Sequence, residues 1–145
     1  MSEYQGELTV LGDAVSNGAM TTYSIIEIGG AVLQKIKVPS GLNNFLPRAL
    51  NQNGKTTLYV NGKVLIGVKL PDGKLYCYDA KVFKILWYIL ILVGLPVVEI
   101  FGLGTGAAIF TAVIFIPFYI NILAEINNYS VSSQLKAQGA IPVGM

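Results

Sequence analysis

One long apolar run constrains this chain more than any other feature. From Ile85 to Ala124, forty residues include a single charged side chain, that of Glu99. As one helix rising about 1.5 Å per residue, the run would be roughly 60 Å long, twice a bilayer core of about 30 Å. Its length therefore predicts two membrane spans.

Three alternating glycines mark the break between the two predicted spans. Gly102, Gly104 and Gly106 follow one another at every second position. Glycine costs about 1 kcal/mol per helical residue relative to alanine and readily takes positive φ. We predict helices at about 84–101 and 106–125, joined by a turn at 102–105. A phosphate loop needs a preceding strand, and an ion filter needs a pore helix for which there is no room, so a simple turn is preferred.

A buried helical hairpin inside a water-soluble protein is the alternative to a membrane hairpin. Helices of a soluble core need a polar face, and neither segment has one. The other 105 residues are too few to wrap two all-apolar helices. Only 12% of the chain is charged, 53% is hydrophobic, and the mean hydropathy is +0.59, which also favours a membrane protein.

The positions of the lysines predict the orientation of the hairpin. Lys81 and Lys84 precede the first span, with Lys74 nearby, and the hairpin turn has no lysine or arginine. By the positive-inside rule, both termini lie in the cytoplasm, and we expect an integral protein of a bacterial cytoplasmic membrane. Aromatic residues expected at the cytoplasmic interface are Trp87, Tyr88 and Tyr119.

Residues 1–83 are predicted to form a cytosolic β domain. Asn61-Gly62 is a strong hairpin signal between alternating strands at 57–60 and 64–70, and Pro71-Asp72-Gly73 turns the chain into a third strand. Gly29-Gly30 joins two further strands at 21–28 and 31–38. With a short helix near 43–50, this order predicts a small antiparallel barrel of OB or SH3 type. The fold class is therefore a membrane α+β protein.

The tail at 126–145 is predicted to be cytosolic. Its apolar residues continue one helical face, so the second span can extend as an amphipathic helix to about residue 137. Gly139, Pro142 and Gly144 are then expected to end all regular structure.

Several residues are candidates for a role in the membrane. Glu99 is the transmembrane polar site, with a role in ion transport or, as we prefer, at the interface or in helix pairing. Gly94 and Pro96, together with the three turn glycines, favour a kink and close helix packing. Four lysines are candidates for contact with anionic lipid headgroups, or are simply solvated: Lys69, Lys74, Lys81 and Lys84.

The residue content argues against catalysis. The chain has no histidine, which excludes Ser-His-Asp and Cys-His chemistry and the common zinc sites. Its one cysteine, Cys77, is expected to be buried and inert, a reactive thiol being the alternative. We therefore expect no catalytic residue, no metal and no cofactor. The net charge of +2 does not favour nucleic acid.

These expectations combine into one functional hypothesis and one alternative. The hypothesis is a non-enzymatic adaptor or subunit of a membrane complex, with the lipid bilayer and a protein partner or a second copy as its contacts. The alternative is an oligomeric pore or ion-conducting protein that its β domain regulates.

Overall fold

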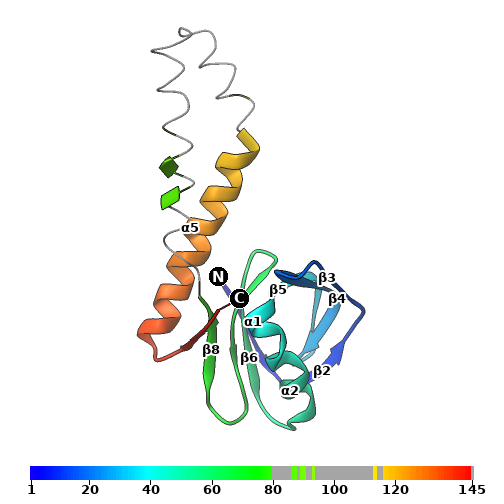
Figure 1. The fold of residues 1–145 in the computed structure, drawn as a ribbon. Helices are drawn as coiled ribbons and strands as arrows, with labels where there is room; N and C mark the ends of the chain where they lie inside the picture. The colour runs from blue at the N-terminus through cyan, green and yellow to red at the C-terminus, as the bar shows by residue number, and fades with distance from the viewer. Residues whose placement is uncertain (80–85, 88, 91–92, 94–112, 114–115, 145) are drawn as a thin grey trace, which may run out of the picture. The chain divides into compact units, whose positions relative to one another are not determined.

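The chain is described by a computed structural model that covers residues 1–79, 86–87, 89–90, 93, 113 and 116–144 (Figure 1). It divides into two compact units. We call Met1–Asp79 together with Ser130–Met145 the β unit, and Ala80–Tyr129 the inserted unit. The chain thus leaves the β unit after Asp79 and re-enters it at Ser130.

The described residues form nine strands and two short helices of the β unit, and one long helix with residues in both units. The strands are β1 (Ser2–Gly6), β2 (Leu8–Leu11), β3 (Ala14–Ser16), β4 (Met20–Ile28), β5 (Ala31–Pro39), β6 (Thr56–Asn61), β7 (Val64–Lys69), β8 (Leu75–Tyr78) and β9 (Ile141–Val143). The helices are α1 (Ser40–Asn43), α2 (Phe45–Asn51) and α5 (Ile116–Ala137).

The local turn signals are confirmed. β6 and β7 form an antiparallel hairpin that pairs Asn61 with Val64, and Gly62 at its turn has φ +60°. β7 continues into β8 across the second predicted turn, and β4 pairs with β5 across Gly29-Gly30. The short helix expected near 43–50 is α2.

The predicted antiparallel barrel is wrong. In the described residues the strands form one mixed sheet with the order β1-β6-β7-β5-β4-β2, and β1 and β2 end this path without pairing with each other. β3 pairs with β4, and β8 and β9 extend the sheet from β7. Two pairings are parallel, β5 with β7 and β8 with β9. Both parallel pairings join segments far apart in sequence, so no local turn signal predicts them.

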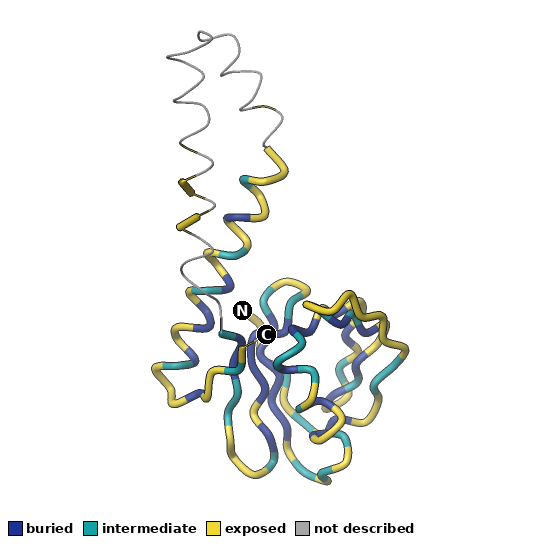
Figure 2. Tube along the Cα trace, viewed as in Figure 1, coloured by how far each residue is buried: buried dark blue, intermediate teal, exposed yellow. Residues whose placement is uncertain are grey.

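The interior of the β unit is apolar. Figure 2 shows long stretches of buried residues in the strands of the β unit. Leu42 and Leu46 of these helices are fully buried, as are Ile26 of β4 and Leu58 of β6. At about 25 cal/mol per Å² of apolar surface, this burial is the main stabilising contribution to the unit.

The described helices contradict the predicted membrane hairpin. In the part of the chain that the structure describes, no helix is both long and apolar enough to cross a membrane. α5 shares 116–125 with the predicted second span and ends at Ala137, where its amphipathic extension was expected to end.

The functional predictions built on that hairpin fail with it. They are the integral membrane location, the lipid bilayer as a partner, the adaptor in a membrane complex and the regulated pore. Within the inserted unit, the described apolar side chains are largely exposed, among them Trp87 at 56% and Leu123 at 66%. Much of the predicted hairpin lies outside the described residues, including Gly94, Pro96, Glu99, Gly102, Gly104 and Gly106.

The tail also differs from the prediction. α5 ends at Ala137, but regular structure resumes in β9, where Tyr76 of β8 pairs with Ile141. The predicted loss of structure after Gly139 is therefore wrong. Pro142 is tolerated because β9 pairs on one side only in the described sheet, so its missing N–H can face away from the ladder.

Candidate functional site

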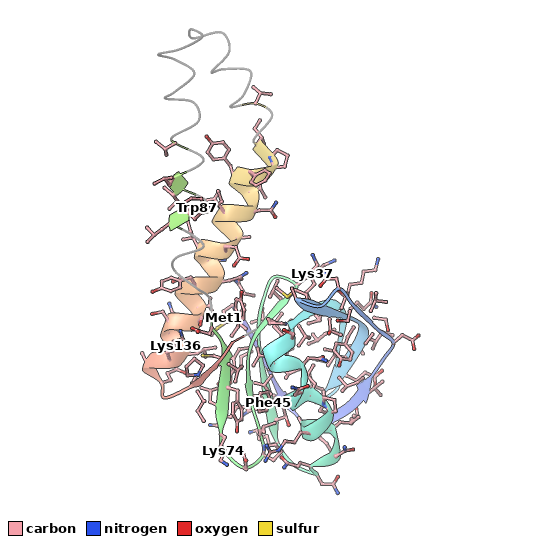
Figure 3. The ribbon with its side chains drawn as sticks, in the orientation of Figure 1. Met1, Lys37, Phe45, Lys74, Trp87 and Lys136 are labelled. Atoms are coloured by element: carbon pink, nitrogen blue, oxygen red, sulfur yellow. The ribbon has the colours of Figure 1, made fainter. Side chains whose placement is uncertain are left out.

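A cavity of about 420 Å³ opens on the β unit beside the β7–β8 hairpin. This is within the range of pockets that hold small molecules. Its lining combines a sheet wall with a wall from the chain after α5: Tyr59, Lys69, Gly73, Lys74, Leu75, Gln138, Gly139 and Ile141. Figure 3 shows Lys74 at the tip of the hairpin.

The sheet wall follows from strand register. Tyr59, Gly67 and Cys77 are register partners across β6, β7 and β8, and they define what we call the Gly67 face. Side chains two residues apart on a strand lie on one face, so Lys69 and Leu75, which pair with each other, also belong to it.

α5 covers only part of the Gly67 face. Val131, Leu135 and Ala140 form a buried apolar cluster with side chains of this face, including Tyr59 and Cys77. A Cβ built on Gly67 would lie 2.7 Å from Leu135 Cδ1, so the absence of a side chain at 67 lets the helix lie close to the strand.

The second wall exists because α5 ends abruptly. Ala140 N–H donates to the Leu135 carbonyl at 3.0 Å, and Gly139 N–H donates to the Lys136 carbonyl at 3.0 Å. With Gly139 at φ +86°, these bonds form a Schellman motif. The chain then reverses into β9, which leaves the end of the β7–β8 hairpin uncovered and creates the cavity.

The charged side chains that line the cavity are both cations. Lys74 Nζ lies 3.9 Å from Asp72 Oδ2, and the Lys74 side chain is 58% exposed. This ion pair therefore contributes little to stability. Among the described residues, no carboxylate lies within ion-pair distance of Lys69. The cavity therefore presents positive charge that its surroundings hardly neutralise.

The neutral groups of the lining add hydrogen-bond donors and apolar surface. Burial, and to a lesser degree the charge of Glu3, raises the pKa of Tyr59, so its hydroxyl stays protonated near neutral pH. The backbone N–H groups of Gly73 and Gly139 are already bonded to carbonyls of Leu70 and Lys136. A ligand would therefore meet lysine, glutamine and tyrosine side chains rather than free backbone donors.

Two polar contacts fix the chain where it leaves and re-enters the β unit. The Ser132 hydroxyl donates to the Tyr78 carbonyl, and Lys136 Nζ lies 2.6 Å from Asp79 Oδ1. Lys136 is labelled near the lower end of α5 in Figure 3. These contacts hold the last turns of α5 against β8.

Cys77 lies beneath this part of α5 and is fully buried. Burial raises the pKa of its thiol, while a hydrogen bond with Ser132 acts in the opposite direction. A buried thiol with a raised pKa is a poor nucleophile. In the described ranges, no three His, Cys, Asp or Glu side chains are grouped as metal ligands.

The structure brings together two of the predicted site residues. Lys69 and Lys74, predicted to contact lipid headgroups, both line the cavity, whereas Lys81 and Lys84 lie outside the described residues. Of the predicted interface aromatics, Trp87 is exposed, Tyr119 is half-buried, and Tyr88 lies outside the described residues.

Sequence reasoning missed the rest of the lining. Gly139 signals a helix end, but nothing local indicates that Gln138 and Ile141 return to the β7–β8 hairpin.

No protein-family model matches the chain, and no curated protein or solved structure resembles it significantly.

Proposed function

We propose that the β unit is a non-enzymatic binding module that takes a small anionic molecule with an apolar part into the cavity beside the β7–β8 hairpin. The observation that carries this proposal is the lining itself. Both of its charged side chains, Lys69 and Lys74, are cations.

The chemistry of the walls supports an anion over a neutral or cationic ligand. A carboxylate or phosphate accepts hydrogen bonds from lysine ammonium groups, and such charge-assisted bonds are stronger than neutral ones. Gln138, whose side chain carries an amide donor, belongs to the same lining. The side chains of Leu75 and Ile141 offer apolar surface to the remainder of the ligand.

A binding role without catalysis also agrees with the residue types. The chain contains no histidine. Among the described residues, the cavity lining includes no carboxylate, serine, threonine or thiol, and Cys77 is buried elsewhere on the same face. These are the groups that supply most general bases and nucleophiles.

Phenyl phosphate is a suitable probe because it joins a dianion to a flat apolar group. We expect the full-length protein to bind it, with amide shifts in an NMR titration concentrated at Lys69, Lys74 and Gln138. Phenol, without the charge, should bind far more weakly. Inorganic phosphate, without the ring, should bind with lower affinity than phenyl phosphate.

A charge variant tests the role of the two lysines. Replacing both by glutamine (K69Q/K74Q) should weaken binding about tenfold, since an exposed cation contributes about 0.7 kcal/mol to such an interaction. K55Q/K63Q is the matched control, because it removes two exposed lysines that do not line the cavity. Equal affinities in the two variants, or no binding by the wild type, would refute the proposed function.

A further inference from the structure

The cavity is composite, since the chain segments that form its two walls are separated by the inserted unit. One wall comes from β6 to β8, and the other consists of Gln138, Gly139 and Ile141. We infer that a ligand in this cavity controls how firmly the segment Ser130–Val143 docks on the Gly67 face. This inference rests on the proposed function, because it concerns regulation at the same site.

The docked segment is attached to the Gly67 face and to one edge strand. Its buried apolar members in the cluster are Val131, Leu135 and Ala140. Its polar attachments are the bond from Ser132 to β8, the ion pair of Lys136 and the pairing of β9 with β8. Because β9 pairs with β8 alone in the described sheet, this segment is expected to open by itself, at a lower free energy than unfolding of the whole unit.

Opening of this segment would destroy the ligand site. If Gln138, Gly139 and Ile141 move away, Lys69 and Lys74 remain on an exposed hairpin with no opposite wall. A ligand that binds only the docked state raises the ratio of docked to open molecules by the factor 1 + [L]/Kd. At a ligand concentration ten times Kd, opening should become about elevenfold rarer.

The linkage also works in the other direction. Weakening the docking contacts lowers the fraction of molecules that can bind, and the apparent Kd equals the intrinsic Kd divided by that fraction. Binding should therefore depend on Leu135, although this residue does not line the cavity.

Hydrogen exchange on the full-length protein tests the inference without any substitution. The amide of Asp79 reports on docking, because it donates to the Val143 carbonyl of the docked segment. With phenyl phosphate at ten times its Kd, exchange of this amide should slow about elevenfold. The amide of Gly12, bonded to Ile25 at the opposite end of the sheet, is the reference for local openings and should not change.

Two variants complete the test. K69Q/K74Q should lose the added protection at a fixed probe concentration. Leu135→Ala should weaken phenyl phosphate binding at least fivefold. If that variant does not fold, Asp79→Asn, which alters only the part-exposed ion pair with Lys136, takes its place with a smaller effect in the same direction.

The outcomes separate the two proposals. If the wild type binds the probe but the exchange of the Asp79 amide is unchanged, the docking inference is wrong and the proposed function stands. If the wild type does not bind the probe, the proposed function fails, and the inference fails with it. Slower exchange together with weaker binding by Leu135→Ala supports both.

Discussion

Replacement of Leu135 by alanine should destabilise the β unit strongly. Leu135 is fully buried, and the atom facing its Cδ1 belongs to a glycine, so no side chain of Gly67 can move in to fill the space. Buried Leu→Ala changes cost about 2–5 kcal/mol, and more where the site cannot collapse. We expect a loss of about 3 kcal/mol in the free energy of unfolding.

Gly67 makes this prediction specific, because it allows a double-mutant cycle. Gly67→Ala alone places a Cβ 2.7 Å from Leu135 Cδ1, and such overpacking costs about 1–3 kcal/mol. In the double variant Cδ1 is absent, and the new Cβ lies 3.2 Å from the Tyr76 carbonyl oxygen and 3.4 Å from Tyr59 Cδ2, which are less severe contacts. The loss in the free energy of unfolding of the double variant should therefore be smaller than the sum of the two single losses, by about 1 kcal/mol or more.

Urea denaturation of the full-length protein, followed by far-ultraviolet circular dichroism, measures these free energies if the m-values stay constant. Leu123→Ala is the control, because Leu123 lies on the same helix but is 66% exposed, and its replacement should change stability by less than about 0.5 kcal/mol. Additive effects in the cycle, or a cost for Leu135→Ala no larger than that of the control, would show that α5 does not pack on Gly67 as described.

Three further predictions concern the contacts around β8. Ser132→Ala should lower stability by about 1–3 kcal/mol in urea denaturation, because the carbonyl of Tyr78 loses a buried donor. Asp79→Asn should cost less than about 1 kcal/mol, an effect that shrinks in high salt, since the ion pair with Lys136 is more than one-third exposed; denaturation at two salt concentrations measures this. The raised pKa of Cys77 favours the neutral thiol in the folded state. The contribution of this thiol to stability is therefore fully present below the pKa of the unfolded thiol and is lost as the pH rises through the folded pKa. Iodoacetamide should label Cys77 slowly at pH 8 until urea unfolds the protein.

Local signals in the sequence were sufficient for the hairpins. Asn61-Gly62 requires positive φ in a two-residue turn, and Gly62 has it, so β6 and β7 can be placed from a few residues. The same reasoning holds for Gly29-Gly30 between β4 and β5.

Pairings between distant segments could not be predicted in this way. β9 lies about sixty residues after β8, and its three residues include a proline, which argues against a strand when viewed alone. Lys69 and Lys74 were recognised as exposed cations, but the second wall of their cavity depends on that same pairing. The continued apolar face after the run predicted a helix to about residue 137, and α5 ends at Ala137.

The late return of the chain has a consequence for biosynthesis. Ser130 is made fifty-one residues after Asp79, which at about 5–20 residues per second corresponds to roughly 3–10 s of translation. During this interval the nascent β8 has no neighbour on one side, and the apolar patch around Gly67 is bare. Until the last residues are synthesised, the nascent sheet therefore exposes an unpaired edge strand. Its protection from aggregation depends on how quickly those residues emerge from the ribosome.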